Sequence, residues 1–122
     1  MDYIPGVCNI GPQEIARRRN IGWIGLIISI LLLGLLIATG VNAWWRLFVF
    51  FPATLSASGF LQAHFHFCSG FARKGIFNFG PAGKAEQVGE EASKAEDKKT
   101  GNKITLYAVL IGVVITILVV LI

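Results

Sequence analysis

Charged residues are absent from three long stretches of this 122-residue chain, and the whole chain contains only two cysteines. Two cysteines are too few to define a disulfide framework. The sequence also lacks a Ser/His/Asp set, a phosphate-binding glycine loop and paired carboxylates within the apolar stretches. Charges inside a membrane usually mark a proton or ion pathway, and here that signature is missing. We expect no catalytic residues and no enzyme activity.

The three uncharged stretches are long enough to cross a membrane. Residues 21–41, 47–67 and 104–122 contain 21, 21 and 19 residues, and a hydrocarbon core about 30 Å thick needs roughly 20 helical residues. Their apolar residues occur in blocks without the period of an amphipathic helix or strand. The sequence therefore predicts an all-α integral membrane protein, in which an antiparallel transmembrane hairpin is followed by a third, C-terminal transmembrane helix.

The remaining segments divide the chain further. Residues 1–20 predict a cytoplasmic segment with a short interfacial helix from Pro12 to Asn20, because proline and Glu14 suit the first turn of a helix. Residues 21–80 form the hairpin and a cytoplasmic-side turn. Residues 81–103 contain five lysines and five acids but no apolar face, so we expect a mobile or only nascently helical charged tether. It leads to the third span, residues 104–122. Because 20 residues precede it, the first apolar run is interpreted as a retained span and not a cleaved signal.

Basic and aromatic residues next to the apolar stretches predict the orientation. Under the positive-inside rule they place the N-terminus in the cytoplasm and the C-terminus outside, across the cytoplasmic membrane. The net charge of +4 then lies beside the membrane, which suits membrane lipid and not nucleic acid. The predicted interface residues are Arg17, Arg18, Arg19, Trp44, Trp45, Arg46, Arg73 and Lys74.

Small residues spaced by four occur in all three spans. Such spacing lets helix backbones approach closely where lipid provides no hydrophobic driving force for association. The pair Gly25 and Ser29 has this spacing, as do Ala53 and Ala57. The residues that we select as helix-packing positions are Gly34, Ala38, Gly59, Ala63, Ala108 and Gly112.

One dense group of polar residues follows the second span. His64, His66 and Cys68, together with Cys8, are ligand types that Zn²⁺ accepts, and a haem could also use a histidine. In a continuing helix His64 and Cys68 share a face while His66 points away. The spacing matches no common zinc signature. Alternatively the histidines are interfacial and Cys68 is a small buried residue, in which case no cofactor is bound.

Two short phrases resemble each other. Residues 9–12 read Asn-Ile-Gly-Pro, and residues 78–81 read Asn-Phe-Gly-Pro. Each composition favours a turn, and both would lie on the cytoplasmic side. We interpret them as two unrelated turns at helix ends, with a paired functional site as the alternative.

Residues 9–80 resemble the YgaP-like family of two-helix inner-membrane domains. The matching features are Asn9-Ile-Gly11, the basic run 17–19, Trp44-Trp45 in a tight turn, Gly59, and Phe67-Cys68 followed by residues 75–77, Gly-Ile-Phe. Cys68 is followed by Ser69, where that family prefers proline. The resemblance implies an antiparallel hairpin that dimerises and has sulfur-related associations, and it assigns no catalytic residue to this chain.

These patterns lead to three hypotheses for the function. The first is a small accessory or assembly subunit that acts through helix contacts in a homo-oligomer or a larger membrane complex. The second is a thiol, sulfur-transfer or metal-binding protein that uses Cys8, Cys68 and His64 at the cytoplasmic face. The third is an oligomeric small transporter or channel, which would need several copies to form a pore.

Overall fold

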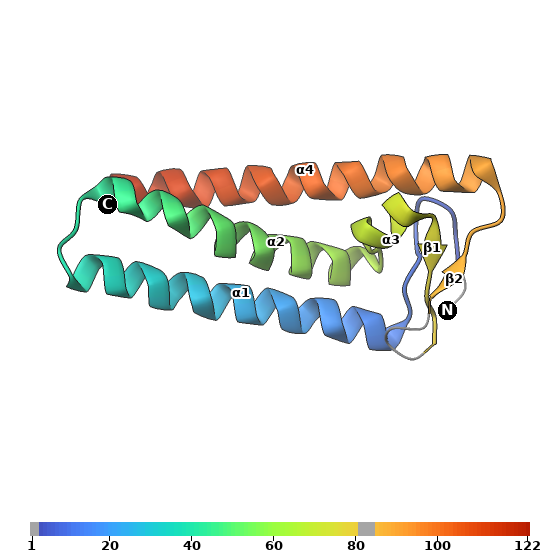
Figure 1. Cartoon of the computed structure of the whole chain (residues 1–122), viewed down its shortest axis with the longest axis horizontal. Coiled ribbons are helices and arrows are strands. Elements are labelled where there is room, and N and C mark those ends of the chain that lie inside the picture. The colour runs from blue at the N-terminus through green and yellow to red at the C-terminus, as the bar shows by residue number, and fades with distance from the viewer. Residues whose placement is uncertain (1–2, 81–84) are drawn as a thin grey trace.

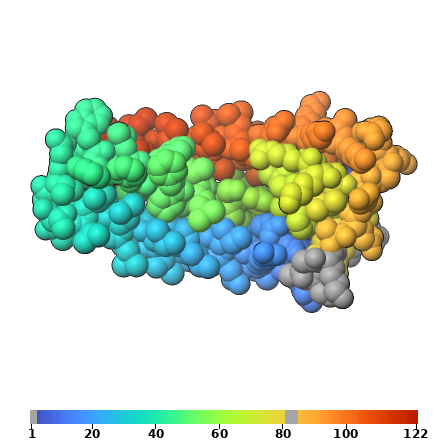
Figure 2. Space-filling model, in the orientation of Figure 1, coloured from blue at the N-terminus to red at the C-terminus, as the bar shows by residue number. Residues whose placement is uncertain are grey.

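Three long antiparallel helical segments lie side by side in the computed structural model, which describes residues 3–80 and 85–122. Helix α1 spans Pro12–Ala38, the 3₁₀ helix η1 (Ala43–Val49) leads directly into α2 (Phe50–Phe65), and α4 spans Glu91–Leu121. Helix α2 lies between α1 and α4 (Figure 1) and fills the space between them along the face shown in Figure 2. We call the end with the α1–η1 connection the turn end, and the opposite end the N-terminal end.

Two of these helices, α1 and α4, are long and apolar enough to cross a membrane. The second expected span, residues 47–67, is divided between η1 and the 16-residue helix α2. The chain is thus mostly helical, with two candidate membrane-spanning helices in its described residues. The three-span arrangement stays a prediction.

Helix α1 begins where the sequence predicts, with Gly11 at the N-cap and with Pro12 and Glu14 in the first turn. It continues without a break to Ala38, and Gly40 follows with φ +67°. The expectation of a separate interfacial helix ending at Asn20 is therefore wrong. No proline or other helix breaker separates the basic run from the apolar residues, so one helix includes both.

Helix α2 ends at Phe65, and His66 takes a left-handed conformation with φ 55°. A short helix α3 (Ser69–Lys74) follows, and Gly75 ends it with φ +70°. Strand β1 (Ile76–Phe77) then pairs with β2 (Glu86–Gln87) in an antiparallel ladder. These two-residue strands are an addition to the expected all-helical fold.

Most of the expected tether belongs to helix α4, which corrects the prediction of a mobile segment. Residues 81–84 of that segment lie outside the described residues, but the helix begins at Glu91 and continues into the apolar stretch. Its buried residues repeat every three or four positions. They are Ser93, Asp97, Gly101, Ile104, Ala108, Gly112 and Thr116. The contact face of the charged part is thus made of small and polar residues, which a search for an apolar face does not detect.

The N-terminal segment provides partners for this polar part of α4. The carboxylate of Asp97, which is fully buried, accepts hydrogen bonds from the Tyr3 hydroxyl at 2.6 Å and from the Gly6 backbone N–H at 2.8 Å. The Thr100 hydroxyl donates to the Gly6 carbonyl oxygen at 2.7 Å. Burial and the Asp97 carboxylate raise the pKa of the Tyr3 phenol well above its usual range, so this phenol stays a donor. These bonds dock residues 3–6 on α4.

Candidate functional site

A buried ion pair lies at the N-terminal end of the helices. Glu14 is fully buried and Arg18 is only 8% exposed, and the Arg18 Nη1 atom lies 2.9 Å from Glu14 Oε2. Arg17, whose side chain is largely exposed, approaches the other carboxylate oxygen at 3.8 Å. Charged groups with this burial persist only when they are paired and hydrogen-bonded. Arg18 is therefore not the exposed interface residue that the basic run predicts.

Cys68 accepts a hydrogen bond from the same arginine. Arg18 Nη2 lies 2.9 Å from Cys68 Sγ, and its guanidinium carbon lies 5.3 Å from the centre of the Phe71 ring. The sulfur of Cys68 thus contacts a cationic donor that also pairs with Glu14. Cys68 is only 5% exposed, so a reagent reaches it only when the surrounding segments move.

The two similar phrases meet beside this cysteine, where they form one paired unit. The Asn78 backbone N–H donates to the Asn9 carbonyl oxygen at 2.9 Å, and the Gly11 N–H donates to the Asn78 carbonyl oxygen at 2.8 Å, which gives a parallel bridge. A Cβ atom on Gly11 would lie 2.8 Å from the backbone of Phe79, so only glycine fits there. The interpretation as two unrelated turns is wrong.

Both asparagine side chains connect this pair to the ion pair and to Cys68. Asn9 donates from Nδ2 to the Cys68 carbonyl oxygen at 3.1 Å and accepts at Oδ1 from the Cys68 N–H at 2.7 Å. Asn78 Nδ2 donates to Glu14 Oε1 at 3.3 Å. One hydrogen-bonded cluster thus joins the start of α1, the segment after α2 and the segment after α3. We name it the polar cluster: Asn9, Glu14, Arg18, Cys68 and Asn78.

The four proposed metal ligands do not form one group. The described part of the chain contains no group of three or more His, Cys, Asp or Glu side chains that could hold a metal ion. His64 is exposed and its ring contacts Phe65, and because α2 ends at Phe65, His64 and Cys68 do not share a helical face. Both cysteines are free thiols. Cys8 donates to the Ile10 carbonyl oxygen at 3.7 Å, and burial raises the pKa of its thiol.

Glycines form the closest contacts between α1 and α2. A Cβ atom on Gly59 would lie 2.5 Å from the Gly22 nitrogen and 2.7 Å from the Arg18 carbonyl oxygen, and one on Gly25 would lie 2.7 Å from the Ser56 nitrogen. On the other side of α2, Gly112 of α4 packs against the Thr54 side chain. These contacts fix α2 between its neighbours at backbone distance.

The six selected packing positions therefore have different roles. Gly59, Ala63, Ala108 and Gly112 are buried, and Gly59 and Gly112 lie against a neighbouring helix. Gly34 and Ala38 are exposed on α1, and a Cβ atom on Gly34 would meet nothing within 4 Å. Within one chain the contact face of α1 is formed by Gly22 and Gly25, so packing at Gly34 and Ala38 against another chain stays a prediction.

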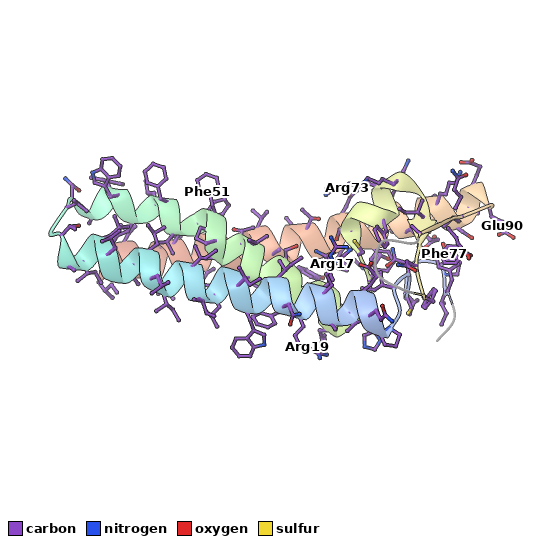
Figure 3. The ribbon with its side chains drawn as sticks, turned by 60° about the horizontal axis from the view of Figure 1, so that its bottom comes forward. Arg17, Arg19, Phe51, Arg73, Phe77 and Glu90 are labelled. Carbon is purple, nitrogen blue, oxygen red and sulfur yellow. The ribbon has the colours of Figure 1, made fainter. Side chains whose placement is uncertain are left out.

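The expected interface residues lie at two levels along the molecule. Trp44 and Trp45 are exposed at the turn end, where Arg46 donates to the Val119 carbonyl oxygen at 3.0 Å and so joins the connection to the last turns of α4. Figure 3 shows Arg17, Arg19 and Arg73 at one level near the N-terminal end. Lys74 is exposed on α3 beside Arg73.

Sequence reasoning missed the buried members of the polar cluster. Glu14 and Arg18 are four residues apart on one helix, which is a visible pairing signal, and the repeated Asn-x-Gly-Pro phrase indicated the pairing of Asn9 with Asn78. Comparison with protein-family models, curated proteins and solved structures finds no match to this chain. The resemblance to the YgaP-like domains stays a prediction.

Proposed function

We propose that this chain is a small integral membrane subunit of the cytoplasmic membrane, which acts through helix contacts in a homo-oligomer or a larger membrane complex. Its three helical segments cross the bilayer, with the N-terminus inside and the C-terminus outside. The apolar exposure of α1 and α4, the tryptophans at the turn end and the cations near the N-terminal end support this placement.

The outer face of α1 is the observation that carries this proposal. Ile27, Leu31, Gly34 and Ala38 follow one another at intervals of four, three and four, so they form one stripe along the helix. This stripe lies opposite the Gly22 and Gly25 face. Ile27 and Leu31 are 54% and 66% exposed, and the space above Gly34 is open. A small pair flanked by large apolar residues lets another helix approach closely.

Substitution of the small pair tests this role. We expect the chain, extracted in mild detergent, to have a mass above that of a monomer or to copurify with a partner subunit. The double variant Gly34→Leu/Ala38→Leu should lose that association, because its side chains fill the open space. Val114→Leu, on an exposed part of α4, is the control and should keep it. Light scattering and copurification from native membranes measure both. A monomeric wild-type chain without a partner contradicts the proposal, as does an unaffected double variant.

A thiol function of Cys68 is the second candidate, and the observation behind it is the hydrogen bond of 2.9 Å that Arg18 donates to the Cys68 sulfur. On this alternative the Cys68 sulfur attacks the outer sulfur of a donor persulfide, the sulfur–sulfur bond of the donor breaks, and the donor leaves as a thiol that takes the Cys68 proton. Mass spectrometry of chain isolated from native membranes under non-reducing conditions should then find the modified residue at Cys68 and not at Cys8. A free thiol in every preparation would exclude sulfur carriage and leave Cys68 a packing role in the polar cluster.

A further inference from the structure

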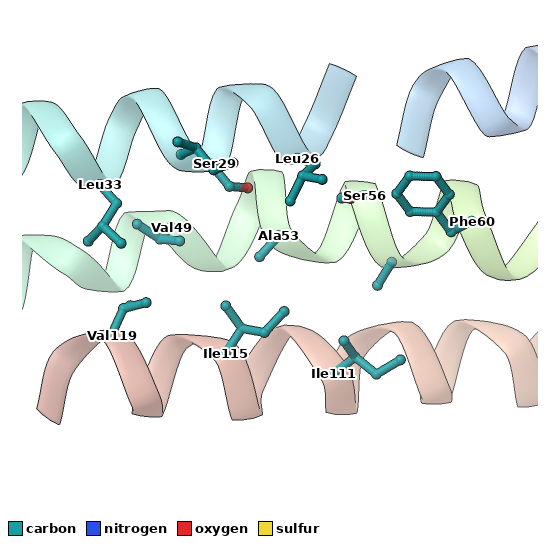
Figure 4. Close-up of a pocket in the computed structure, with 12 residues that line it drawn as sticks. Leu26, Ser29, Leu33, Val49, Ala53, Ser56, Phe60, Ile111, Ile115 and Val119 are labelled. Carbon is teal, nitrogen blue, oxygen red and sulfur yellow. The ribbon is translucent and has the colours of Figure 1, made fainter. Parts of the chain in front are cut away.

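An apolar groove runs along one face of the three helices (Figure 4). Small residues of α2, namely Ala53, Ser56 and Ala57, form its floor, while larger residues of α1 and α4 form its walls. The hydroxyl of Ser56 donates to the Gly22 carbonyl oxygen at 2.8 Å, so it offers no free donor to the groove. The volume of about 350 Å³ falls in the range of small-ligand sites. The groove therefore suits an apolar chain.

A polar pocket adjoins the groove at the N-terminal end, and Phe60 lines both. Arg19, His64 and His66 provide its polar groups, and Trp23 packs edge-on against Phe60 with ring centres 5.3 Å apart. Guanidinium and imidazole N–H groups donate hydrogen bonds to anions. No aspartate or glutamate lines the groove or the pocket within residues 3–80 and 85–122.

Helical periodicity makes the pocket and the groove one continuous site. On α1 the lining residues follow intervals of four and three from Arg19 through Trp23 to Leu33. On α2 they follow intervals of four and three from His64 through Phe60 to Ala53, and Val49 of η1 continues the row. Leu33 lies 14 positions after Arg19 on α1, a rise of about 21 Å along the helix. One leaflet of the hydrocarbon core is about 15 Å thick, so the groove is long enough for an acyl chain.

We propose that this site binds an anionic phospholipid. The phosphate accepts hydrogen bonds from Arg19 and the two histidines, and one acyl chain lies in the groove over the floor of α2. Arg19 lies at the same level as Arg17 and Arg73 (Figure 3), which is the level of lipid headgroups in the proposed orientation. The inference rests on the membrane placement proposed above, but it does not depend on association through the outer face of α1.

Quenching of Trp23 fluorescence tests the site. Trp44→Phe and Trp45→Phe leave Trp23 as the single tryptophan of the chain. The protein is reconstituted in phosphatidylcholine vesicles with a minor fraction of phosphatidylglycerol, and either lipid carries bromine on its acyl chains. One basic residue near an anionic lipid favours binding about fivefold. We therefore expect brominated phosphatidylglycerol to associate with Trp23 at least about fivefold more strongly than brominated phosphatidylcholine.

Substitutions distinguish lipid binding at this specific site from attraction of anionic lipid by the general surface charge. Arg19→Gln, alone or with His64→Gln and His66→Gln, should remove the preference. Arg73→Gln is the matched control, because Arg73 lies at the same level but donates to the Thr105 hydroxyl at 3.1 Å, outside the pocket. Equal quenching by the two lipids in the otherwise native chain overturns the proposal, and so does an Arg73→Gln effect as large as that of Arg19→Gln. The comparison of the two brominated lipids, made on the chain that keeps Arg19, His64 and His66, tests the proposal even if the triple variant does not fold.

The same experiment distinguishes this inference from the proposed function. In the Gly34→Leu/Ala38→Leu variant the lipid preference should persist while association is lost. A lipid preference that disappears together with association would overturn a site formed within one chain. A chain that fails to float with vesicles would overturn both proposals, because both require membrane placement.

Discussion

Replacing Gly59 by alanine should force α1 and α2 apart. The new Cβ atom would lie 2.5 Å from the Gly22 nitrogen and 2.7 Å from the Arg18 carbonyl oxygen. Both are backbone atoms of α1, which cannot rotate away as a side chain can. Overpacking of this kind costs about 1–3 kcal/mol. At Gly34 the same substitution meets open space, and alanine is about 1 kcal/mol better than glycine within a helix.

Both positions lie within helices, so the propensity gain applies to both variants and cancels in the comparison. The two alanine variants should therefore differ in their free energy of unfolding by about 1–3 kcal/mol, with Gly59→Ala the less stable. Equilibrium unfolding in mixed micelles, followed by circular dichroism at dilutions where the chain is monomeric, measures this difference. Variants that agree within about 0.5 kcal/mol, the usual effect of a surface substitution, would refute the close backbone contact between α1 and α2.

Three further predictions concern the polar cluster and its surroundings. Arg18→Gln should destabilise the chain by about 3 kcal/mol, because it removes one partner of a buried ion pair; in the double variant Arg18→Met/Glu14→Leu, unfolding measurements should find most of the loss restored. Asn9→Ala leaves the buried Cys68 N–H without its acceptor and should cost about 1–3 kcal/mol, with faster hydrogen exchange at that amide as the specific readout. Burial raises the pKa of the Cys8 thiol, so the neutral thiol stabilises the fold below the ordinary cysteine pKa and this contribution is lost as pH rises through the folded value. Alkylation of native Cys8 should accordingly begin at higher pH than in the unfolded chain, and identical pH profiles would contradict this.

Sequence reasoning predicted the elements that depend on local signals. The start of α1 at Pro12 follows from proline and an acid in the first turn, and the long apolar stretches in α1 and α4 follow from composition. The charged half of α4 was predicted poorly for a physical reason. Its contact residues, such as Ser93 and Asp97, are not apolar, and the Tyr3 partner of Asp97 lies more than 90 residues away in the sequence.

The candidate site was predicted less well because it depends on tertiary contacts. The shared face of His64 and Cys68 required a continuing helix, but α2 ends at Phe65 and His66 turns left-handed. Arg18 belongs to a basic run of the kind that lies at membrane surfaces, so the sequence predicted an interface position for it. Its burial depends on tertiary partners: Cys68 accepts a hydrogen bond from Arg18, and Asn78 donates to Glu14, the carboxylate that pairs with Arg18.

The docked N-terminal segment sets an order for assembly. Asn9 and Gly11 bond to Asn78, and residues 3–6 bond to Asp97 and Thr100, yet a ribosome makes the chain from its N-terminus. Residues 3–11 therefore stay without these partners until the hairpin and the first turns of α4 have been synthesised. Closure of this segment over α4 is thus a late event in biogenesis, and a chain truncated before residue 97 would leave residues 3–6 exposed to proteases.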